Sequence, residues 1–256
     1  CRAPATPPWR VEPVVASAVA ALTAPLAQVQ LRDRSGGDAG CVADDGLCPG
    51  WIADNFDRYV DPLVQHVYLV LASVAIGFAI SFALALVAHR HRWMIAPIVQ
   101  VTGILYTLPS IAVFFLLLPL TGRGSLTAIV ALVAYSLLII FRNITTGLDN
   151  VPEEARDAGR GMGLTDRQLL WRVELPLALP EIMAGLRIAT TTTVGLATLA
   201  FFAGAGGLGG QIFADINFKS NVVVAGGLAV LLAAVLDAAI LLAQRAITPW
   251  TRARAA

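Results

Sequence analysis

Long stretches without a charged side chain alternate with shorter charged segments along this chain. Five stretches contain no Asp, Glu, Lys or Arg: Pro62–Ala88, Trp93–Gly122, Gly124–Phe141, Ile188–Ala214 and Ser220–Leu236. A helix needs about 20 apolar residues to cross the hydrocarbon core of a bilayer, and backbone groups in lipid must pair internally, which favours helices. The pattern predicts an all-α integral membrane protein with about five transmembrane helices, at roughly 63–88, 95–118, 125–145, 182–203 and 221–244.

The segment Val11–Leu31 is a sixth candidate span. It is rich in Ala and Val, but it contains Glu12 and two prolines. It fits either a weak membrane helix or an uncleaved signal-like anchor. The chain starts at Cys1 rather than Met, which indicates a truncated start, and a lipid-modified Cys1 would need a targeting segment before it. We expect 1–31 to be a tail or weak span, 32–62 an extracytoplasmic segment, 63–248 the transmembrane domain and 249–256 a cytoplasmic tail.

Composition supports a membrane location, and the placement of charge orients the helices. Hydrophobic residues make up 57% of the chain, charged residues 14%, and the mean hydropathy is +0.73, which leaves too little charge to cover a soluble domain. Cytoplasmic loops are enriched in Lys and Arg. One face would carry eleven basic residues: Arg90, Arg92, Arg142, Arg156, Arg160, Arg167, Arg172, Arg187, Arg245, Arg252 and Arg254. The opposite face would carry five: Arg32, Arg34, Arg58, Arg123 and Lys219. The face with eleven basic residues includes the segment 142–187 and the C-terminal tail, and it is therefore expected in the cytoplasm. The segment 32–62 is expected outside.

Two cysteines fall in the segment that this orientation places outside. Six residues separate Cys41 from Cys48, and a disulfide persists in an oxidising compartment. We expect a disulfide here, with two unpaired small residues as the alternative. Zinc is disfavoured because neither a His nor a second Cys pair lies nearby.

The segment Val151–Pro180 is too long and too patterned to be only a connector. Pro152 followed by two acids favours a helix start. Gly161 and Gly163 favour the end of that helix, because glycine accepts the left-handed conformation of a helix terminus. The pattern therefore predicts a first short helix between these positions.

A second short helix is predicted directly after it. Thr165 and Gln168 have the spacing of a capping box, and Pro176 is expected to end the helix. The result is a helix-turn-helix parallel to the membrane, which could dock a partner as one rigid unit. A structured loop that only joins two spans is the alternative.

The spacing in this loop resembles a motif of binding-protein-dependent ABC importer permeases. Their cytoplasmic loop has the form E-A-A, three residues, G, nine residues, I, one residue, L-P. In this chain the motif positions are occupied by Asp157, Ala158, Gly159, Gly163, Val173, Leu175 and Pro176. Asp and Val replace Glu and Ile conservatively, and Gly159 replaces the second Ala.

Further runs are similar to the osmoprotectant branch of that family, the permeases for glycine betaine, choline, carnitine and related quaternary amines. The similarity covers roughly 41–245 and is carried by Tyr106–Ser110, Asp157–Thr165, Glu174–Ala189 and Gly204–Gly209. It implies an importer permease for such osmoprotectants. A permease for another small solute is the alternative.

The resemblance also implies how such a subunit works. The loop would dock in a groove of a cytoplasmic ATPase through Asp157–Leu164, which includes Arg160, while Val173, Leu175 and Pro176 hold the second helix against the membrane. A second permease, identical or related, would complete the pore, and an extracytoplasmic binding protein would deliver the solute. ATP and Mg would bind to the partner ATPase and no cofactor to this chain. The expected location is the bacterial inner membrane.

Glycines between the fourth and fifth spans match a nucleotide-binding pattern only superficially. Gly204, Gly206 and Gly209 fit G-x-G-x-x-G, but that fingerprint needs a preceding strand and a later acid. A gate, a contact for the binding protein, or a plain tight turn fits Gly204, Gly206, Gly207 and Gly209 better.

Polar residues inside the spans are candidates for function. Asp237 is the one acid well inside a span, and an intramembrane charge is a functional hypothesis by default. We expect it to pair with Arg187 or Arg245 rather than to line the path. The threonine run Thr190–Thr193 of the fourth span either lines the path or bonds back to its own helix; the candidates for lining are Thr190, Thr191 and Thr193.

Catalytic and metal-binding patterns are absent from the sequence. There is no G-x-x-x-x-G-K-[ST] phosphate loop, so ATP would have to be used by a partner, and we expect neither an enzyme nor a nucleic-acid partner. His66 is expected at the membrane interface, and His89 and His91 in a basic inner loop rather than at a metal. The alternative of a different class is a self-contained ion-coupled secondary transporter, which would show internal repeats; no convincing repeat is found.

Overall fold

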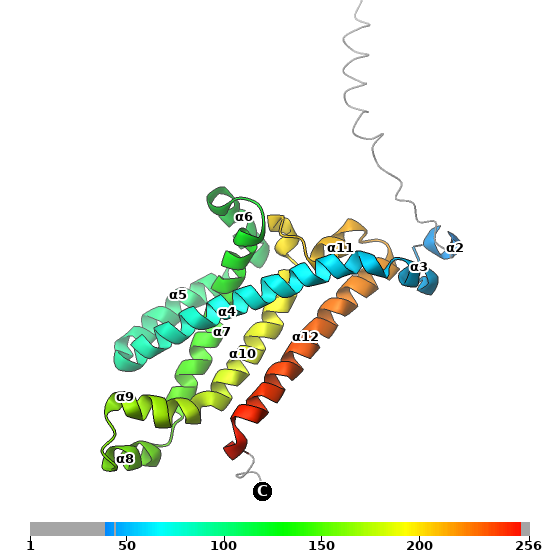
Figure 1. Cartoon of the computed structure of the whole chain (residues 1–256). Coiled ribbons are helices and arrows are strands. Elements are labelled where there is room, and N and C mark those ends of the chain that lie inside the picture. The colour runs from blue at the N-terminus through cyan, green and yellow to red at the C-terminus, as the bar shows by residue number, and fades with distance from the viewer. Residues whose placement is uncertain (1–38, 44, 252–256) are drawn as a thin grey trace, which may run out of the picture.

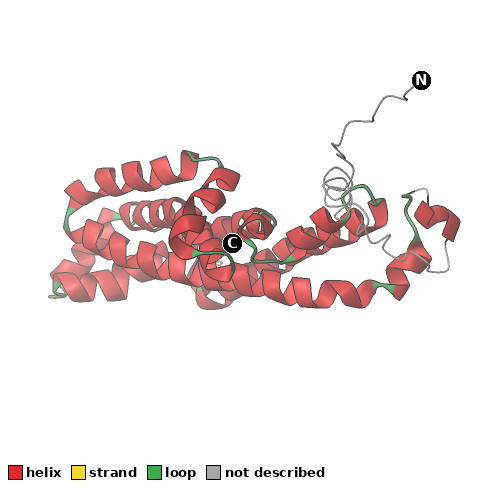
Figure 2. Cartoon of the chain, turned by 90° about the horizontal axis from the view of Figure 1, so that it is seen from above, coloured by secondary structure: helices red, strands yellow, loops and turns green. Residues whose placement is uncertain are grey.

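The computed structural model describes residues 39–43 and 45–251, and every regular element within these ranges is helical. The expected N-terminal span and the last five residues lie outside the described part. Figure 1 shows long helices running side by side, and Figure 2 shows the same helices from above. The long helices are α4 (Val60–Arg90), α5 (Ile95–Thr107), α6 (Ser110–Thr121), α7 (Ser125–Asp149), α10 (Leu175–Ala197) and α12 (Lys219–Ile247). The short ones are α2 (Ala39–Ala43), α3 (Pro49–Asp54), α8 (Glu153–Gly161), α9 (Asp166–Leu169) and α11 (Leu208–Ala214).

Several helices of the described part are long and apolar enough to cross a membrane. Three meet this condition alone, in Phe56–Arg90, Ser125–Asp149 and Lys219–Ile247, and the pair Arg92–Thr107 and Ser110–Thr121 meets it together. Helix α10 is not among them, because prolines, threonines and two charged residues lower its hydropathy. The multi-pass membrane character is therefore confirmed, while the number five stays a prediction.

The span predicted at 95–118 consists of two helices, broken at Pro109. The chain bends by 99° between α5 and α6. Proline has no N–H and forces the residue before it into an extended conformation; accordingly, Leu108 has φ −64° and ψ 139° before Pro109. The hydroxyl of Tyr135 in α7 donates a hydrogen bond of 2.6 Å to the Leu108 carbonyl, which the bend leaves outside the helical ladder.

Helix α7 is the centre of the packing: it contacts both α4 and α10, which also contact each other. Small residues let the backbones approach closely. A Cβ on Gly77 of α4 would lie 2.1 Å from the Ser136 hydroxyl oxygen of α7, and a Cβ on Gly185 of α10 would lie 2.3 Å from Asn143 Cβ. These two close contacts fix α4 and α10 against α7.

Candidate functional site

Helices α8 and α9 form a short helical unit where α7 ends and α10 begins (Figure 1). Helix α8 starts after Pro152, has Glu153 and Glu154 in its first turn and has Arg160 in its last turn. Acids at the N-terminus and a cation at the C-terminus complement the helix dipole. The local sequence therefore favours this helix before any tertiary contact forms.

The turn after α8 depends on Gly163. Its N–H donates to the Arg160 carbonyl at 2.9 Å, and the N–H of Leu164 donates to the Gly159 carbonyl at 3.1 Å. This is the Schellman pattern, in which the residue after the helix cap takes positive φ. Gly163 has φ +80°, where a side chain is strained. The glycine of the motif is thus required by the backbone of this turn.

Gly159 is buried where the two short helices touch. A Cβ at this position would lie 2.5 Å from Leu169 Cδ1, 3.5 Å from Leu164 Cδ1 and 3.7 Å from Val173 Cγ2. Glycine in place of the second alanine of the motif therefore lets α9 and the residues after it pack directly on α8.

Thr165 caps α9 in the predicted capping box. The N–H of Gln168 donates to Thr165 Oγ1 at 3.4 Å, and the N–H of Thr165 donates to Gln168 Oε1 at 3.0 Å. Two backbone donors at the helix start are thereby satisfied.

The prediction that Pro176 ends this second helix is wrong. The chain continues from α9 through a π-helical turn, η3 (Leu170–Glu174), into α10, whose first turn contains Pro176. Proline cannot donate a hydrogen bond and crowds the preceding turn. The wider π turn, in which the N–H of Leu175 donates to the Leu170 carbonyl, accommodates it. Helix α10 therefore begins seven residues before the predicted start at 182.

Glu174 connects this unit to the membrane helices. Its side chain is only 6% exposed; Oε1 accepts a hydrogen bond of 2.9 Å from Arg156 Nε, and Oε2 lies 2.9 Å from His89 Nε2. Arg156 Nη2 also donates to the Leu148 carbonyl at 2.7 Å. One carboxylate thus links α8 to the last turn of α4, and Arg156 extends the link to the end of α7.

This role of Glu174 was not predicted from the sequence, and His89 was expected only as part of a basic loop. The available signal is an acid between Val173 and Leu175, in a stretch that otherwise buries apolar side chains. A buried acid needs a partner, so its presence there indicates a basic residue elsewhere in the fold, although not which one.

The outward face of α8 is formed by Asp157, Ala158, Arg160 and Met162, all of them exposed. Asp157 Oδ1 lies 3.5 Å from Arg160 Nη1. Met162 is 74% exposed, and its flexible thioether adapts to partner surfaces. This face can contact another protein, whereas Val173 and Leu175 point into the packing between the short helices and the bundle.

At the opposite end, a glycine-rich turn connects η4 (Ala200–Ala203) to α11 (Figure 1). Gly204, Gly206 and Gly207 have φ of 77°, 74° and 79°, which only glycine adopts readily. A Cβ on Gly209 would lie 1.7 Å from the Thr198 carbonyl oxygen. The four glycines therefore build a tight, closely packed turn; a gating role for them stays a prediction.

His66 of α4 lies against this turn and is fully buried rather than interfacial, contrary to our expectation. Its Nε2 is 3.1 Å from the Val194 carbonyl oxygen of α10. A Cβ on Gly207 would lie 3.2 Å from His66 Nδ1. The imidazole thus joins α4, α10 and the glycine-rich turn.

The threonines of α10 bond to their own helix. Thr190 Oγ1 donates to the Leu186 carbonyl at 2.7 Å, and Thr191 Oγ1 donates to the Arg187 carbonyl at 3.1 Å. Thr190 and Thr193 are both 2% exposed. This geometry fits the packing alternative, and a path-lining role for Thr190, Thr191 and Thr193 stays a prediction.

Arg187 and Asp237 join α10 to α12. Arg187 Nε donates to Asp237 Oδ1 at 2.8 Å, and Arg187 Nη2 donates to Oδ2 at 2.7 Å. This two-point geometry is the strongest form of a guanidinium–carboxylate pair. Of the two partners considered for Asp237, the structure selects Arg187.

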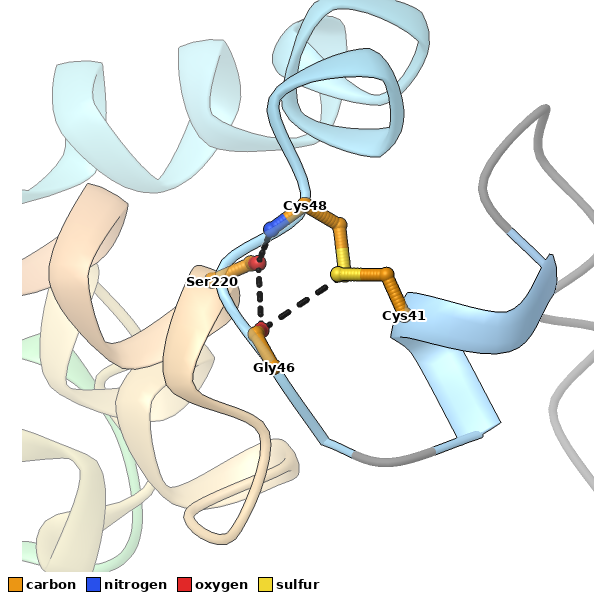
Figure 3. The surroundings of a disulfide bond; sticks show 4 residues. All are labelled: Cys41, Gly46, Cys48 and Ser220. Carbon is orange, nitrogen blue, oxygen red and sulfur yellow. Dashed lines mark hydrogen bonds between the residues drawn. A yellow bond between two sulfur atoms is a disulfide. The ribbon is translucent and has the colours of Figure 1, made fainter.

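A disulfide between Cys41 and Cys48 closes a loop against the start of α12 (Figure 3). The N–H of Cys48 donates to Ser220 Oγ at 2.7 Å, and Ser220 Oγ donates to the Gly46 carbonyl at 2.9 Å. Beside this contact, the rings of Trp51 and Phe218 meet edge to face at 4.6 Å. The loop and α3 therefore cover one end of α12.

Comparison with known proteins assigns this arrangement to a family. The model of the family described as "Binding-protein-dependent transport system inner membrane component" matches residues 54–253. The chain belongs to this family. It is a permease subunit of an ABC importer, which confirms the resemblance seen in the loop motif and excludes the self-contained secondary transporter.

Curated relatives of this permease carry osmoprotectant names. It is 39% identical over 187 residues to the choline transport system permease protein OpuBB of Bacillus subtilis, covering 72% of this chain and 86% of that one. It is 38% identical over 206 residues to the osmoprotectant import permease protein OsmW of Salmonella typhimurium, covering 78% and 96%. The glycine betaine/carnitine/choline transport system permease protein OpuCB of Bacillus subtilis is 37% identical over 187 residues, covering 72% and 86%.

Solved structures confirm the fold of the permease. An inward-facing structure of the MetNI methionine ABC transporter aligns with a TM-score of 0.63 at 23% identity, over 75% of this chain and 94% of that chain. A structure of an amino acid ABC transporter with histidines aligns with a TM-score of 0.63 at 14% identity, over 76% and 96%.

Proposed function

We propose that this permease imports quaternary-amine osmoprotectants such as glycine betaine, choline or carnitine. The names of the relatives support this solute class, because all three that are cited above refer to choline or to osmoprotectants. Another small solute is the competing assignment. Competition by choline, glycine betaine and carnitine for uptake in proteoliposomes distinguishes the two.

Aromatic rings at the end that we propose to be external support a quaternary amine. Phe201 stacks on Phe213 at 4.2 Å and lies 4.1 Å from Phe202, which is 5.7 Å from Phe115. Phe115 is 50% exposed and Phe213 44%. Ring faces attract quaternary ammonium groups, so these residues suit a solute that enters from this end.

The unit of α8 and α9 serves as the coupling loop that docks in a groove of a cytoplasmic ATPase. The observation that carries this proposal is that the unit is held at two places. The turn at Gly163 holds α8 and α9 together, and Glu174 holds the unit against the helix bundle. A unit held in this way moves as one body, so closure of two ATPase subunits on ATP would be transmitted to α10. The docking surface is Asp157–Leu164, while Val173, Leu175 and Pro176 fix the unit to α10.

The remaining assignments follow from the proposed docking of the unit in a cytoplasmic ATPase. The coupling loop, 150–180, and the C-terminus are cytoplasmic, the segment 32–62 is outside, and 63–248 is the permease domain in the bacterial inner membrane. The chain has no ATPase site of its own; ATP and Mg bind to the partner. A second permease completes the pore, and an external solute-binding protein delivers the solute to the end formed by α3, α6 and α11.

Gly163 and Gly161 provide a matched test of docking. Gly163→Ala places a Cβ at positive φ, whereas Gly161→Ala lies in the same exposed turn with open space around its Cβ. We expect Gly163→Ala to reduce co-purification of the partner ATPase about tenfold, and Gly161→Ala to leave it unchanged. The reason is that a strained αL residue costs roughly 1–2 kcal/mol and distorts the turn.

Equal co-purification with both variants would contradict the docking role, provided that both accumulate in the membrane like wild type. Uptake of labelled choline by the same vesicles then tests the solute class separately, because a permease that binds its ATPase but ignores quaternary amines has a different solute.

A further inference from the structure

A cavity of about 710 Å³ opens between the last turns of α4 and helix α9. Its polar wall carries three guanidinium groups from three elements: Arg90 ends α4, Arg160 ends α8 and Arg167 lies in α9. Its other wall is apolar and is formed by Leu86, Leu169 and Leu170. The cavity therefore combines positive charge with a hydrophobic side.

The charge of the cavity is positive after its acids are taken into account. Glu174 also lines it, but its carboxylate is held by Arg156 and His89. Asp166 lies in the first turn of α9, where an acid complements the helix dipole. Arg160 is paired with Asp157.

Two cations of the cavity remain available for a ligand. Arg90 and Arg167 are both exposed. In the described part of the chain, neither has an ion-pair partner. A bound anion would thus meet two guanidinium groups without ion-pair partners, with Asp166 as the remaining acid of the cavity wall.

Two tryptophans place the cavity at the membrane surface. The ring of Trp171 lies edge-on to Phe82 of α4 at 6.4 Å and is 52% exposed. Trp93, in the turn after α4, is 74% exposed. Tryptophan concentrates at the head-group level of a bilayer. Helix α9 lies between α8 and the ends of α4 and α5 (Figure 1). The cavity lies beside α9 and shares only Arg160 with the outward face of α8.

We propose that this cavity binds the phosphate head group of an anionic phospholipid of the inner leaflet. Basic pockets beside cytoplasmic helix ends recognise such head groups, and guanidinium groups suit phosphate oxygens. The apolar wall distinguishes a lipid from a free phosphate, because only a lipid brings an acyl chain to cover Leu86 and Leu170. The bound lipid would link α4 to the coupling loop. The proposal rests on the cytoplasmic orientation proposed above.

Lipid binding is tested on the full chain in nanodiscs of phosphatidylcholine with and without phosphatidylglycerol. Hydrogen exchange of the amides in 86–92 and 165–171 should slow when phosphatidylglycerol is present. Retention of phosphatidylglycerol is measured by native mass spectrometry. The variant Arg90→Gln with Arg167→Gln should bind it about thirtyfold more weakly, given the contribution of two basic residues near an anionic surface. Arg172→Gln, exposed but outside the cavity, is the matched control.

The outcomes separate the sources of the anion. Three results together support the proposal: phosphatidylglycerol slows the exchange, inorganic phosphate does not, and only the double variant loses this protection. Equal protection by inorganic phosphate would mean a free-anion site and overturn it. Protection by the ATPase but not by the lipid would assign the cavity to the docking surface, which also overturns it. Failure of ATPase docking alone leaves the lipid result unaffected, because the lipid is measured on nanodiscs without ATPase, which expose both membrane faces, and the ATPase is added only in a separate arm.

Discussion

Arg156 of α8 donates a hydrogen bond of 2.9 Å to Glu174, 18 residues later in the π turn that leads into α10. Both side chains are largely buried, at 15% and 6% exposure. The same carboxylate contacts His89 at the end of α4. The unit of α8 and α9 is therefore fastened to the helix bundle by a charged contact that lies apart from its outward face.

Replacing Glu174 should loosen the coupling loop without altering its docking face. Removing one partner of a buried ion pair costs roughly 3–5 kcal/mol, because the other charge stays buried. We expect Glu174→Gln to lower the thermal stability of the detergent-solubilised permease and to uncouple ATP hydrolysis from uptake. Glu153→Gln, an exposed acid of the same unit, should behave like wild type. Unchanged coupling in Glu174→Gln would remove Glu174 from the transmission route.

The bend between α5 and α6 should depend on the hydroxyl of Tyr135. Tyr135→Phe leaves the Leu108 carbonyl without its side-chain donor, and loss of a part-buried hydrogen bond costs about 0.5–1.5 kcal/mol. Differential scanning fluorimetry should show a lower melting temperature, by about 2–4 °C for each kcal/mol. Tyr106→Phe is the control, because its ring packs on Tyr135 at 6.0 Å while the bend keeps its hydrogen bond. Equal shifts in both variants would mean that loss of a phenolic hydroxyl in general, and not of the bond to Leu108, lowers the melting temperature.

Folding of the permease should require Arg187 and Asp237 to be paired, rather than require either charge by itself. An unpaired charge inside a span is costly, and removal of both partners is tolerated better than removal of one. We expect Asp237→Asn to reduce the amount of folded permease several-fold and Arg187→Gln with Asp237→Asn to restore most of it. Size-exclusion chromatography of the solubilised protein measures this. If the double variant is as poor as the single one, the charges act in transport rather than in packing.

The disulfide should hold the loop between Cys41 and Cys48 against α12. Closing a loop of this length stabilises the loop by about 2.5 kcal/mol in the chain-entropy estimate. The double variant Cys41→Ser with Cys48→Ser should therefore accelerate hydrogen exchange at Ser220 and its neighbours. The reason is that the backbone N–H of Cys48 and the carbonyl of Gly46, which both bond to the Ser220 hydroxyl, lose their fixed positions. Reduction of the wild type should give the same acceleration. Protection that survives both treatments would show that the packing of Trp51 on Phe218 suffices.

The sequence predicted those parts of the unit of α8 and α9 whose conformation depends only on residues close together in the chain. Positive φ at a helix terminus requires glycine, so the end of α8 at Gly163 could be predicted, and Thr165 with Gln168 satisfies backbone donors within one turn. Pro176 was misjudged because the π turn before it is maintained by packing and by Glu174, which no local rule contains. Glu174 itself pairs with residues that are distant along the chain, so its partners could not be identified from its neighbours.

The membrane helices show the same division. Pro109 favours a break in the helix at this place, but the hydrogen bond at the 99° bend comes from Tyr135, 27 residues from the carbonyl that accepts it. The ends of α4, α7 and α12 lie close to the predicted ones because a charge-free stretch sets the length of a span. Helix α10 began earlier than predicted, because its first turns pack on α7 beside Gly147 rather than follow hydropathy.

Site-specific photo-crosslinking of the assembled transporter tests the docking claim most directly. A benzophenone amino acid replaces either Met162, on the outward face of α8, or Trp93, an equally exposed residue in the turn after α4. The account predicts an ATPase adduct from position 162 and none from position 93. An adduct from position 93 alone, or from neither position in a transporter that still hydrolyses ATP, would contradict docking through the unit of α8 and α9.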